Sequence, residues 1–336
     1  MLQEAAEGPA AAARLLAAEG RAFAELGAAL RHRPPLSLLT VARGSSDHAA
    51  HYMAYLVMAR LGRLVTSLPM SLVTLYRSRI VCDGLVALGF SQSGQSPDLV
   101  APMREFSAQG ARTIAFVNDP ASPLAQACQQ TFALHAGPER SVAATKSYIT
   151  QLVAGASLAA AWQQDADFSA ALQALPEALD TAWQQDWTPA LEVLKAAERL
   201  YVIGRGTGLP IATEAALKFK EVCGIQAEAY SGAEVQHGPM ALVDRGFPML
   251  VFAPHGPAFE GLLLLAGQMR ERGARVLLAA PPGTPGAELP LAATGHVDLD
   301  PVAMVQSFYR MVEALAVARG LNPDQPRHLN KVTRTQ

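Results

Sequence analysis

Residues 85–98 read LVALGFSQSGQSPD and carry the clearest indication of the fold. The uninterrupted apolar run at residues 85–90 predicts a β-strand that is buried on both faces. After a loop of Ser, Gln and Gly, the order Ser96, Pro97, Asp98 is typical of a helix start, with a cap, a proline at the first helical position and an early acid. A strand, a loop and a helix in succession indicate an α/β protein with a parallel sheet.

The same alternation extends in both directions along the first half of the chain. Apolar runs at residues 36–42, 113–117 and 131–135 predict further strands, and residues 47–61 and 123–129 are helical in pattern. Strands that alternate with helices pair in parallel, because each helix carries the chain back across the sheet. We therefore expect one parallel sheet of four or five strands, flanked by helices.

The pattern restarts in the second half, after a connector that has no strand signal. The expected elements there are strands at residues 200–203, 249–253 and 276–280 and a helix at 210–222. The first strand of each half runs into an Arg-Gly turn, at Arg43-Gly44 and at Arg205-Gly206, which indicates a divergent duplication. We expect two similar α/β domains, divided as a helical leader (1–35), a first domain (36–168), a helical connector (169–197), a second domain (198–320) and a tail (321–336).

Composition argues against several classes of protein. The 336 residues include 27 Lys and Arg against 29 Asp and Glu, so no net field attracts a nucleic acid or an anionic membrane. The three cysteines are far apart and form no C-x-x-C pair, so neither a disulfide framework nor a zinc site is expected. The N-terminus lacks signal-peptide order, and the apolar residues 147–162 are too few and too polar to span a bilayer. We expect a cytoplasmic protein with small-molecule partners.

The loop after the strand at 85–90 is the clearest candidate for ligand binding. Ser91, Ser93 and Ser96 supply hydroxyls, Gly94 permits close backbone approach, and the helix that follows presents unpaired N–H groups. These features predict a phosphate site that needs no Arg or Lys, at the carboxyl end of a strand, where open α/β sheets bind ligands. The alternative is a turn that only caps a helix.

A second hydroxyl loop, with Ser45 and Ser46, also follows a strand and precedes a helix. Two such loops on neighbouring strands would converge on one ligand, although this loop alone predicts only a helix cap. His48 and His51 share a helix face, but no third ligand follows at matching spacing, so no metal site is expected.

Charged residues in the second half are candidates for acid–base chemistry. Glu214, Lys218 and Glu221 lie at i, i+4 and i+7, and from this spacing alone the favoured interpretation is a solvent-exposed helix face. The carboxylate of Glu221 and the imidazole of His237 would instead supply an acid–base pair if both lay near one sugar ligand, although a lone His on a loop is more often incidental than catalytic. Lys331 offers an amine that can attack a carbonyl, and the alternative is a solvated surface lysine.

Short motifs occur in order along the chain: Ser91-Gln92-Ser93-Gly94, Val142-Ala143-Ala144-Thr145-Lys146, Glu214-Ala215-Ala216-Leu217-Lys218, Lys220-Glu221, Ala227-Glu228-Ala229-Tyr230, His237-Gly238-Pro239 and Asp324-Gln325-Pro326-Arg327. In this order they resemble the sugar isomerase (SIS) family, specifically the double-SIS isomerase half of glucosamine-6-phosphate synthase and its stand-alone deaminase relatives. The resemblance covers nearly the whole chain, and it implies two SIS-type (flavodoxin-like) domains, each a parallel sheet flanked by helices.

The resemblance implies a site for a phosphorylated hexose or hexosamine, without a metal or a cofactor. It assigns Glu221 to proton transfer between C1 and C2, His237 to ring opening, and Lys331 to an imine with the ketose. In the family this histidine comes from the neighbouring subunit, which implies a homodimer with a shared active site. The residues implied to hold the phosphate or to line the site are Ser45, Ser46, Ser91, Gln92, Ser93, Ser96, Val142, Glu214 and Lys218.

Two departures from the synthase pattern bear on the reaction. Ala144 stands where the synthase has Ser, and the chain shows no glutaminase segment that would supply ammonia. We therefore expect the reverse reaction, from glucosamine 6-phosphate to fructose 6-phosphate and ammonia. The alternatives are an isomerase or deglycase for another phosphorylated amino sugar, an ammonia-dependent synthase, and a non-catalytic sugar-phosphate-binding regulator. Retention of Glu221, His237 and Lys331 together argues against the regulator.

Overall fold

A computed structural model describes residues 1–331, which form two compact units. The N-terminal unit contains Ala10–Glu139 and Lys146–Gln173, together with Asn330 and Lys331. The C-terminal unit contains Met1–Pro9, Arg140–Thr145 and Ala174–Leu329. Residues 332–336, the end of the tail expected at 321–336, lie outside the described residues.

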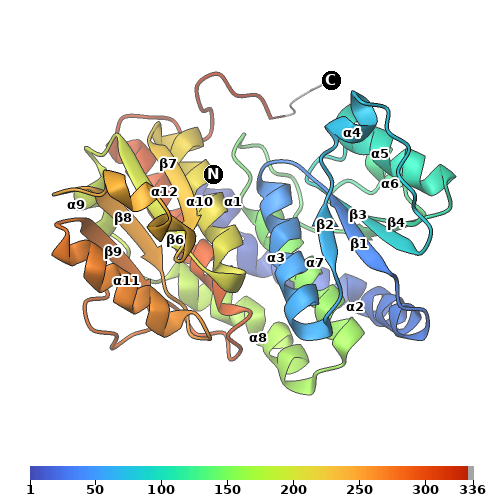
Figure 1. Ribbon diagram of the computed structural model, residues 1–336, viewed down its shortest axis with the longest axis horizontal. Coiled ribbons are helices and arrows are strands. Elements are labelled where there is room, and N and C mark those ends of the chain that lie inside the picture. Colours follow the sequence, from blue (N-terminus) through green and yellow to red (C-terminus); the bar gives the residue numbers. More distant parts are fainter. Residues whose placement is uncertain (332–336) are drawn as a thin grey trace. The chain divides into compact units, whose positions relative to one another are not determined.

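The N-terminal unit is built on a five-stranded parallel sheet with the order β2-β1-β3-β4-β5 (Figure 1). The expected parallel α/β sheet is therefore confirmed, with one strand, β2, that the apolar pattern did not indicate. Residues Leu39 of β1 and Thr113 of β4 both pair with Ala87 of β3, so the three apolar strands form the middle of the sheet. The strands are β1 (Ser37–Val41), β2 (Val65–Ser67), β3 (Leu85–Ser91), β4 (Arg112–Val117) and β5 (Gln130–Ala133).

Helices cover this sheet, and the most buried of them is α7 (Lys146–Gln163). Figure 1 shows α7 beside α3 (Ser45–Leu61). Gly155 makes this close approach possible, because a Cβ at that position would lie 2.8 Å from the Cβ of Met53. The apolar segment at 147–162 is thus a buried helix of this unit. The other helices are α2 (Gly8–His32), α4 (Ser71–Thr74), α5 (Pro97–Ala108), α6 (Pro123–Ala127) and α8 (Ala166–Trp183).

The C-terminal unit repeats the same topology. Its five parallel strands have the order β10-β9-β8-β6-β7. Read from β7 to β10, this order matches that of the first sheet from β2 to β5. The duplication inferred from the two Arg-Gly turns is therefore confirmed, since β6, like β1, pairs with the second and third strands of its own unit. The strands are β6 (Arg199–Gly204), β7 (Gln226–Ser231), β8 (Pro248–Phe252), β9 (Arg275–Ala280) and β10 (Leu289–Pro290).

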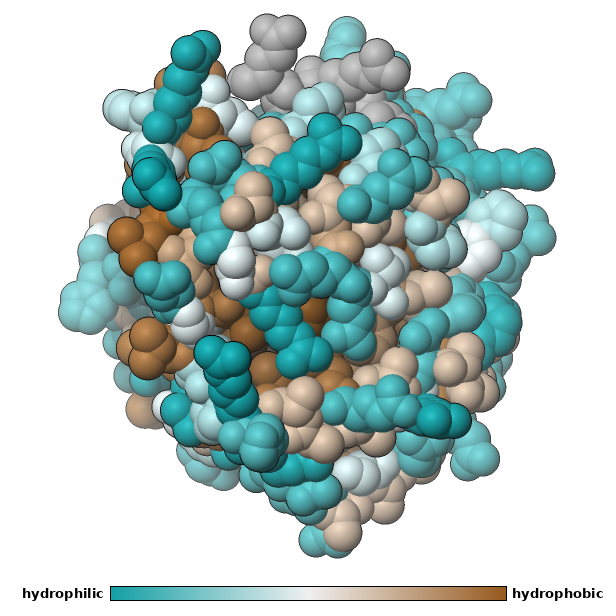
Figure 2. Space-filling view, turned by 90° about the vertical axis from the view of Figure 1, so that its right-hand side faces the viewer, coloured by the Kyte–Doolittle hydropathy of each residue, from teal (hydrophilic) through white to brown (hydrophobic). Residues whose placement is uncertain are grey.

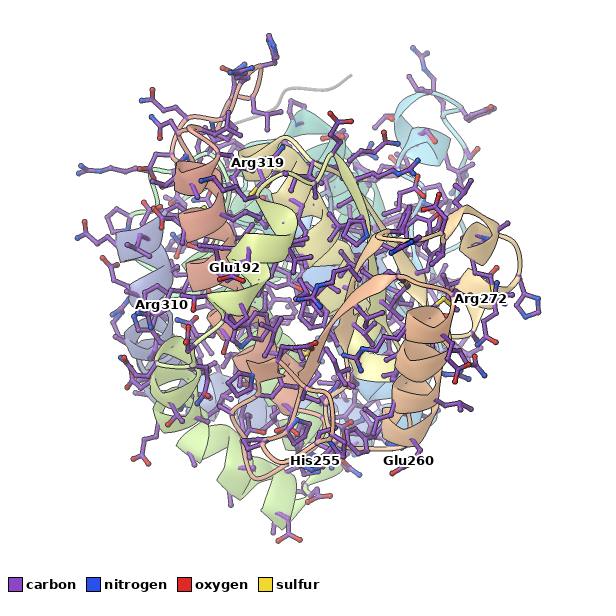
Figure 3. The ribbon with its side chains drawn as sticks, turned by 90° about the vertical axis from the view of Figure 1, so that its left-hand side faces the viewer. Glu192, His255, Glu260, Arg272, Arg310 and Arg319 are labelled. Atoms are coloured by element: carbon purple, nitrogen blue, oxygen red, sulfur yellow. The ribbon has the colours of Figure 1, made fainter. Side chains whose placement is uncertain are left out.

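Two long helices, α10 (Leu209–Cys223) and α12 (Asp300–Ala318), pack against each other in this unit. Arg319 lies at the end of α12 (Figure 3). Its guanidinium donates to the carbonyls of Lys195 at 2.7 Å and Cys223 at 2.8 Å. One guanidinium therefore joins the last turns of three helices, where carbonyls lack helical partners. The remaining helices are α1 (Leu2–Ala6), α9 (Pro189–Leu194), α11 (Phe259–Glu271), η1 (Gly206–Gly208), η2 (Glu234–Gln236) and η3 (Pro239–Leu242).

Polar and charged side chains dominate the molecular face in Figure 2, with hydrophobic residues interspersed among them. Exposed hydrophobic residues of the N-terminal unit include Leu36, Leu64, Tyr76 and Val81. Among residues 1–331, no helix combines the length and the hydrophobicity that a membrane span requires.

Candidate active site

The hydroxyl loop after β3 is a tight turn that only glycine allows. Gly94 has a φ of 66°, and a Cβ there would collide with the hydroxyl of Ser122. The Oγ of Ser91 accepts from the N–H of Gly94 at 3.0 Å, and the Oγ of Ser93 accepts from the N–H of Gln95 at 3.3 Å. Both hydroxyls act only as acceptors toward the described residues, so their O–H groups remain able to donate to an anion.

Helix α5 begins where the sequence places it, at Pro97, with Ser96 in the N-cap position. Ser96 therefore has the predicted N-cap position, but its side chain makes no capping hydrogen bond to the helix. The early acid, Asp98, is only 3% exposed, and the Nε of Arg43 donates to its Oδ2 at 3.0 Å. The loop thus carries an ion pair that sequence spacing did not reveal.

The second hydroxyl loop lies at the same edge of the sheet. Gly44, with a φ of 54°, leads from β1 into α3, which begins at Ser45. Because β1 and β3 are adjacent and parallel, their carboxyl ends lie side by side, and so do the starts of α3 and α5. The half-buried Ser45 and Ser46 therefore share an edge with the loop at 91–96, as the convergence of two loops requires.

In the C-terminal unit, α10 carries a buried cluster of charges. The Nζ of Lys218 lies 3.1 Å from Oε1 of Glu214 and 2.6 Å from Oε2 of Glu221. The side chains of Lys218 and Glu214 are fully buried, whereas 20% of the Glu221 side chain is exposed. The interpretation as a solvent-exposed face, which spacing favoured, is therefore wrong.

The protonation of Lys218 follows from this arrangement. Burial disfavours its charge, but the carboxylates of Glu214 and Glu221 outweigh burial and raise the pKa of Lys218 above its ordinary value. The hydroxyl of Tyr309, on α12, also donates to Glu214 at 3.1 Å. The buried ammonium of Lys218 thus holds the partly exposed carboxylate of Glu221 in position.

His237 lies in an exposed segment between η2 and η3 of the same unit. Its backbone N–H donates to the carbonyl of Glu234 at 2.9 Å, and its imidazole forms no hydrogen bond or ion pair with any of residues 1–331. Gly238, with a φ of 134°, follows it. Nearby, the hydroxyl of Tyr230 donates to Glu228 at 2.5 Å, and this bond raises the pKa of Tyr230 to about 12.

Lys331 lies in the N-terminal unit, where its Nζ is 3.7 Å from Oε2 of Glu139. The side chain of Glu139 is fully buried and accepts from the hydroxyl of Ser147 at 2.5 Å, at the start of α7. Glu139 was not predicted as a site residue, because the sequence distinguishes it only by its position shortly before the motif at 142–146. Val142 belongs to the C-terminal unit, and its N–H donates to the carbonyl of Asp324 at 3.3 Å.

The predicted residues therefore fall into two groups. Lys331 and the two hydroxyl loops belong to the N-terminal unit, and Val142, His237 and the α10 cluster belong to the C-terminal unit. No group of three His, Cys, Asp or Glu side chains within residues 1–331 is arranged to hold a metal ion. Serine hydroxyls and helix starts suit an anionic group, and a carboxylate, an imidazole and an amine suit proton transfer and imine chemistry.

Comparison with known proteins gives a consistent result. Residues 33–161 and 193–292 match the SIS domain. A crystal structure of a protein from Silicibacter pomeroyi, named as a candidate phosphosugar isomerase, is 44% identical, covers 96% of this chain and 99% of its own, and superposes with a TM-score of 0.91.

Curated relatives include two proteins named glutamine–fructose-6-phosphate aminotransferase [isomerizing]. The one from Thermus thermophilus is 33% identical over 91% of this chain and 53% of its own length. The one from Aeropyrum pernix is 38% identical over 88% of this chain and 50% of its own length. The chain thus spans about half the length of the curated relatives it matches.

Proposed function

Because the chain belongs to the SIS domain family, we propose that it is an isomerase of phosphorylated hexoses or hexosamines. The preferred reaction that we propose converts glucosamine 6-phosphate and water to fructose 6-phosphate and ammonia. The names of the similar proteins support this class of substrate, since they specify a phosphosugar isomerase and an isomerizing fructose-6-phosphate aminotransferase.

The observation that carries the proposal is the state of Glu221. Its Oε2 is held 2.6 Å from the buried Nζ of Lys218, yet a fifth (20%) of its side chain stays exposed. A general base must reach its substrate and keep a fixed position, and this carboxylate meets both conditions. An isolated surface glutamate would meet only the first.

The proposed proton transfer uses the open-chain aldehyde of the sugar. Glu221 takes the proton from C2 and returns a proton to C1, while O1 gains a proton and the amino nitrogen loses one, which turns the 2-amino aldehyde into a C2 imine. Ammonia then leaves C2 and water supplies the oxygen of the new ketone, so atoms balance and no electrons are exchanged with a second molecule. The phosphate stays bound throughout, and Ser91, Gln92, Ser93 and Ser96 are proposed to hold it, together with Ser45 and Ser46.

Lys331 is proposed to enter at the imine stage. Its amine adds to the C2 imine and displaces ammonia, and water then hydrolyses the resulting Lys331 imine to the ketone and frees the amine. Glu139, 3.7 Å from this amine, places a buried carboxylate beside the cation that forms on it. This contact supports a role for Lys331 beyond that of a surface lysine.

We propose that His237 opens the sugar ring and that it acts in the site of a neighbouring subunit. An exposed imidazole on a loop, without a side-chain partner among residues 1–331, is free to enter a second copy of the chain. A homodimer with two shared sites is the assembly that this arrangement favours.

Three other functions follow from the same side chains. An isomerase or deglycase for another phosphorylated amino sugar would use the same base and phosphate loop. Ammonia-dependent synthesis of glucosamine 6-phosphate is the same reaction run backwards. A regulator that only binds the sugar phosphate would need the serine loop but not the buried support behind Glu221, so it is the least favoured.

The test is product analysis with purified protein. Glucosamine 6-phosphate is supplied without added metal, and ammonia and fructose 6-phosphate are both quantified. Equal amounts of the two products support the proposal. Binding of the sugar phosphate without either product would refute the deaminase reaction and direct the search to other phosphorylated amino sugars. Binding without turnover of any of them would favour the non-catalytic regulator.

A further inference from the structure

An ion pair joins the two hydroxyl loops of the N-terminal unit. Arg43 follows β1 and Asp98 opens α5, and the Nε of Arg43 donates to Oδ2 of Asp98 at 3.0 Å. The carboxylate is 3% exposed, whereas 58% of the arginine side chain is exposed. The buried partner therefore holds one edge of an otherwise accessible guanidinium.

Only part of the guanidinium is used by the protein. Its terminal nitrogens, Nη1 and Nη2, make no hydrogen bond to any of residues 1–331. An arginine presents five N–H donors in a rigid fork, so the four donors on the two terminal nitrogens remain for a ligand. With Nε fixed by Asp98, their direction is largely fixed as well.

The charges of the two hydroxyl loops indicate what the free donors of Arg43 would bind. Within residues 42–48 and 91–98, Arg43 is the one Lys or Arg, while Asp47 and Asp98 are acidic. Without Arg43, these two segments would carry two carboxylates and no Lys or Arg to offset the charge of a phosphate dianion at the serine loop. Charge-assisted hydrogen bonds from arginine to phosphate oxygens are among the strongest that proteins make.

The second unit lacks this pair although it has the same topology. Arg205 occupies the position after β6 that Arg43 occupies after β1, but it forms no ion pair within the described residues. Helix α11, the counterpart of α5, carries Glu260 in its first turn instead of a buried aspartate. The pair is thus found only in the unit that contains the serine loop.

We propose that Arg43 is a direct ligand of the phosphate of the substrate and that Asp98 positions it. The proposal rests on the function proposed above, and it adds a cation to a site that the sequence predicted to work without one. Asp98 is a positioning residue, because it acts through Arg43 and not on the substrate.

The test measures binding of fructose 6-phosphate by calorimetry to wild type and to Arg43→Ala, Arg43→Lys, Asp98→Asn and the double variant Arg43→Ala/Asp98→Asn. We expect Arg43→Ala to weaken binding roughly 10- to 100-fold, and Arg43→Lys to weaken it less. The double variant should bind as weakly as Arg43→Ala, because the lost contact is with the ligand. Unphosphorylated fructose should show no such difference between variants.

Arg21→Ala is the matched control, since Arg21 also donates through Nε to a carboxylate, Glu25, at 2.8 Å, on an exposed part of α2. It should bind like wild type. Recovery of wild-type affinity in the double variant would show that Arg43 only neutralises Asp98, which overturns the proposal. Equal affinity of Arg43→Ala and wild type overturns it as well. Absence of binding to wild type, with no turnover of any phosphosugar, would overturn the proposed function itself.

Discussion

Replacing Lys218 by methionine tests the buried cluster behind Glu221. The side chain of Lys218 is fully buried between Glu214 and Glu221, at 3.1 and 2.6 Å from their carboxylates. Methionine fills a similar volume but leaves the fully buried Glu214 carboxylate without this ammonium. Removing one partner of a buried ion pair costs about 3–5 kcal/mol, and the cluster lies too deep for solvent to screen it. The melting temperature Tm should fall by roughly 6–20 °C at pH 8.

The pH dependence has a definite sign. In wild type the raised pKa of Lys218 means that its contribution is fully present below its unfolded pKa of about 10.4 and is lost only as the pH rises through the higher folded value. Between pH 5.5 and 8 that contribution is constant. In Lys218→Met, protonation of the buried Glu214 carboxylate stabilises the folded state, because it removes an unpaired buried charge. The folded state of this variant therefore binds more protons than its unfolded state. The deficit in Tm should therefore be smaller at pH 5.5 than at pH 8.

The assay is thermal denaturation followed by circular dichroism at both pH values. Lys220→Met is the control, because Lys220 is an exposed residue of the same helix, and it should change stability by no more than about 0.5 kcal/mol. Lys218→Met/Glu214→Gln should recover much of the loss, since the amide can still accept from Tyr309. The reasoning is refuted if Lys218→Met melts like Lys220→Met at pH 8, or if adding Glu214→Gln lowers Tm further.

Two other predictions concern the thiols and the assembly. Burial raises the pKa of Cys128 and of Cys223 to about 12 and also raises that of Cys82, so little thiolate forms at pH 8. The native protein should therefore react slowly with a disulfide reagent and the denatured protein quickly, and a fast reaction of the native protein would contradict the raised thiol pKa values. Glu221→Gln and His237→Ala should each be inactive alone. Co-expression should restore activity, because a site shared between subunits would then contain one intact Glu221 and one intact His237. Inactive mixed dimers would place both residues in the site of one subunit.

The central strands could be predicted from the sequence, whereas three edge strands could not. β3 and β4 are apolar along their length because helices cover both faces of the sheet. β2 and β7 lie at sheet edges and are partly exposed, so neither has a continuous apolar run. β10 has only two residues, Leu289 and Pro290, too few for any periodicity to be seen.

The site shows the same limit. The serine loop could be recognised because its signal is local, with a buried strand before it and a helix start after it. The burial of Lys218 could not be predicted, because spacing identifies a helix face and only packing against α12 decides whether that face meets water. The contacts of Arg43 with Asp98 and of Glu139 with Lys331 join distant parts of the sequence and leave no local pattern.

Proton transfer by Glu221 is tested most directly by running the reaction in D₂O. Glucosamine 6-phosphate is incubated with wild type or Glu221→Gln, and the fructose 6-phosphate formed is examined by NMR for deuterium at C1. We expect wild type to place solvent deuterium at C1 and Glu221→Gln to be slower by roughly 10²- to 10⁴-fold, the usual contribution of a general base. Formation of the same deuterated product at the wild-type rate by Glu221→Gln would contradict the role of this carboxylate.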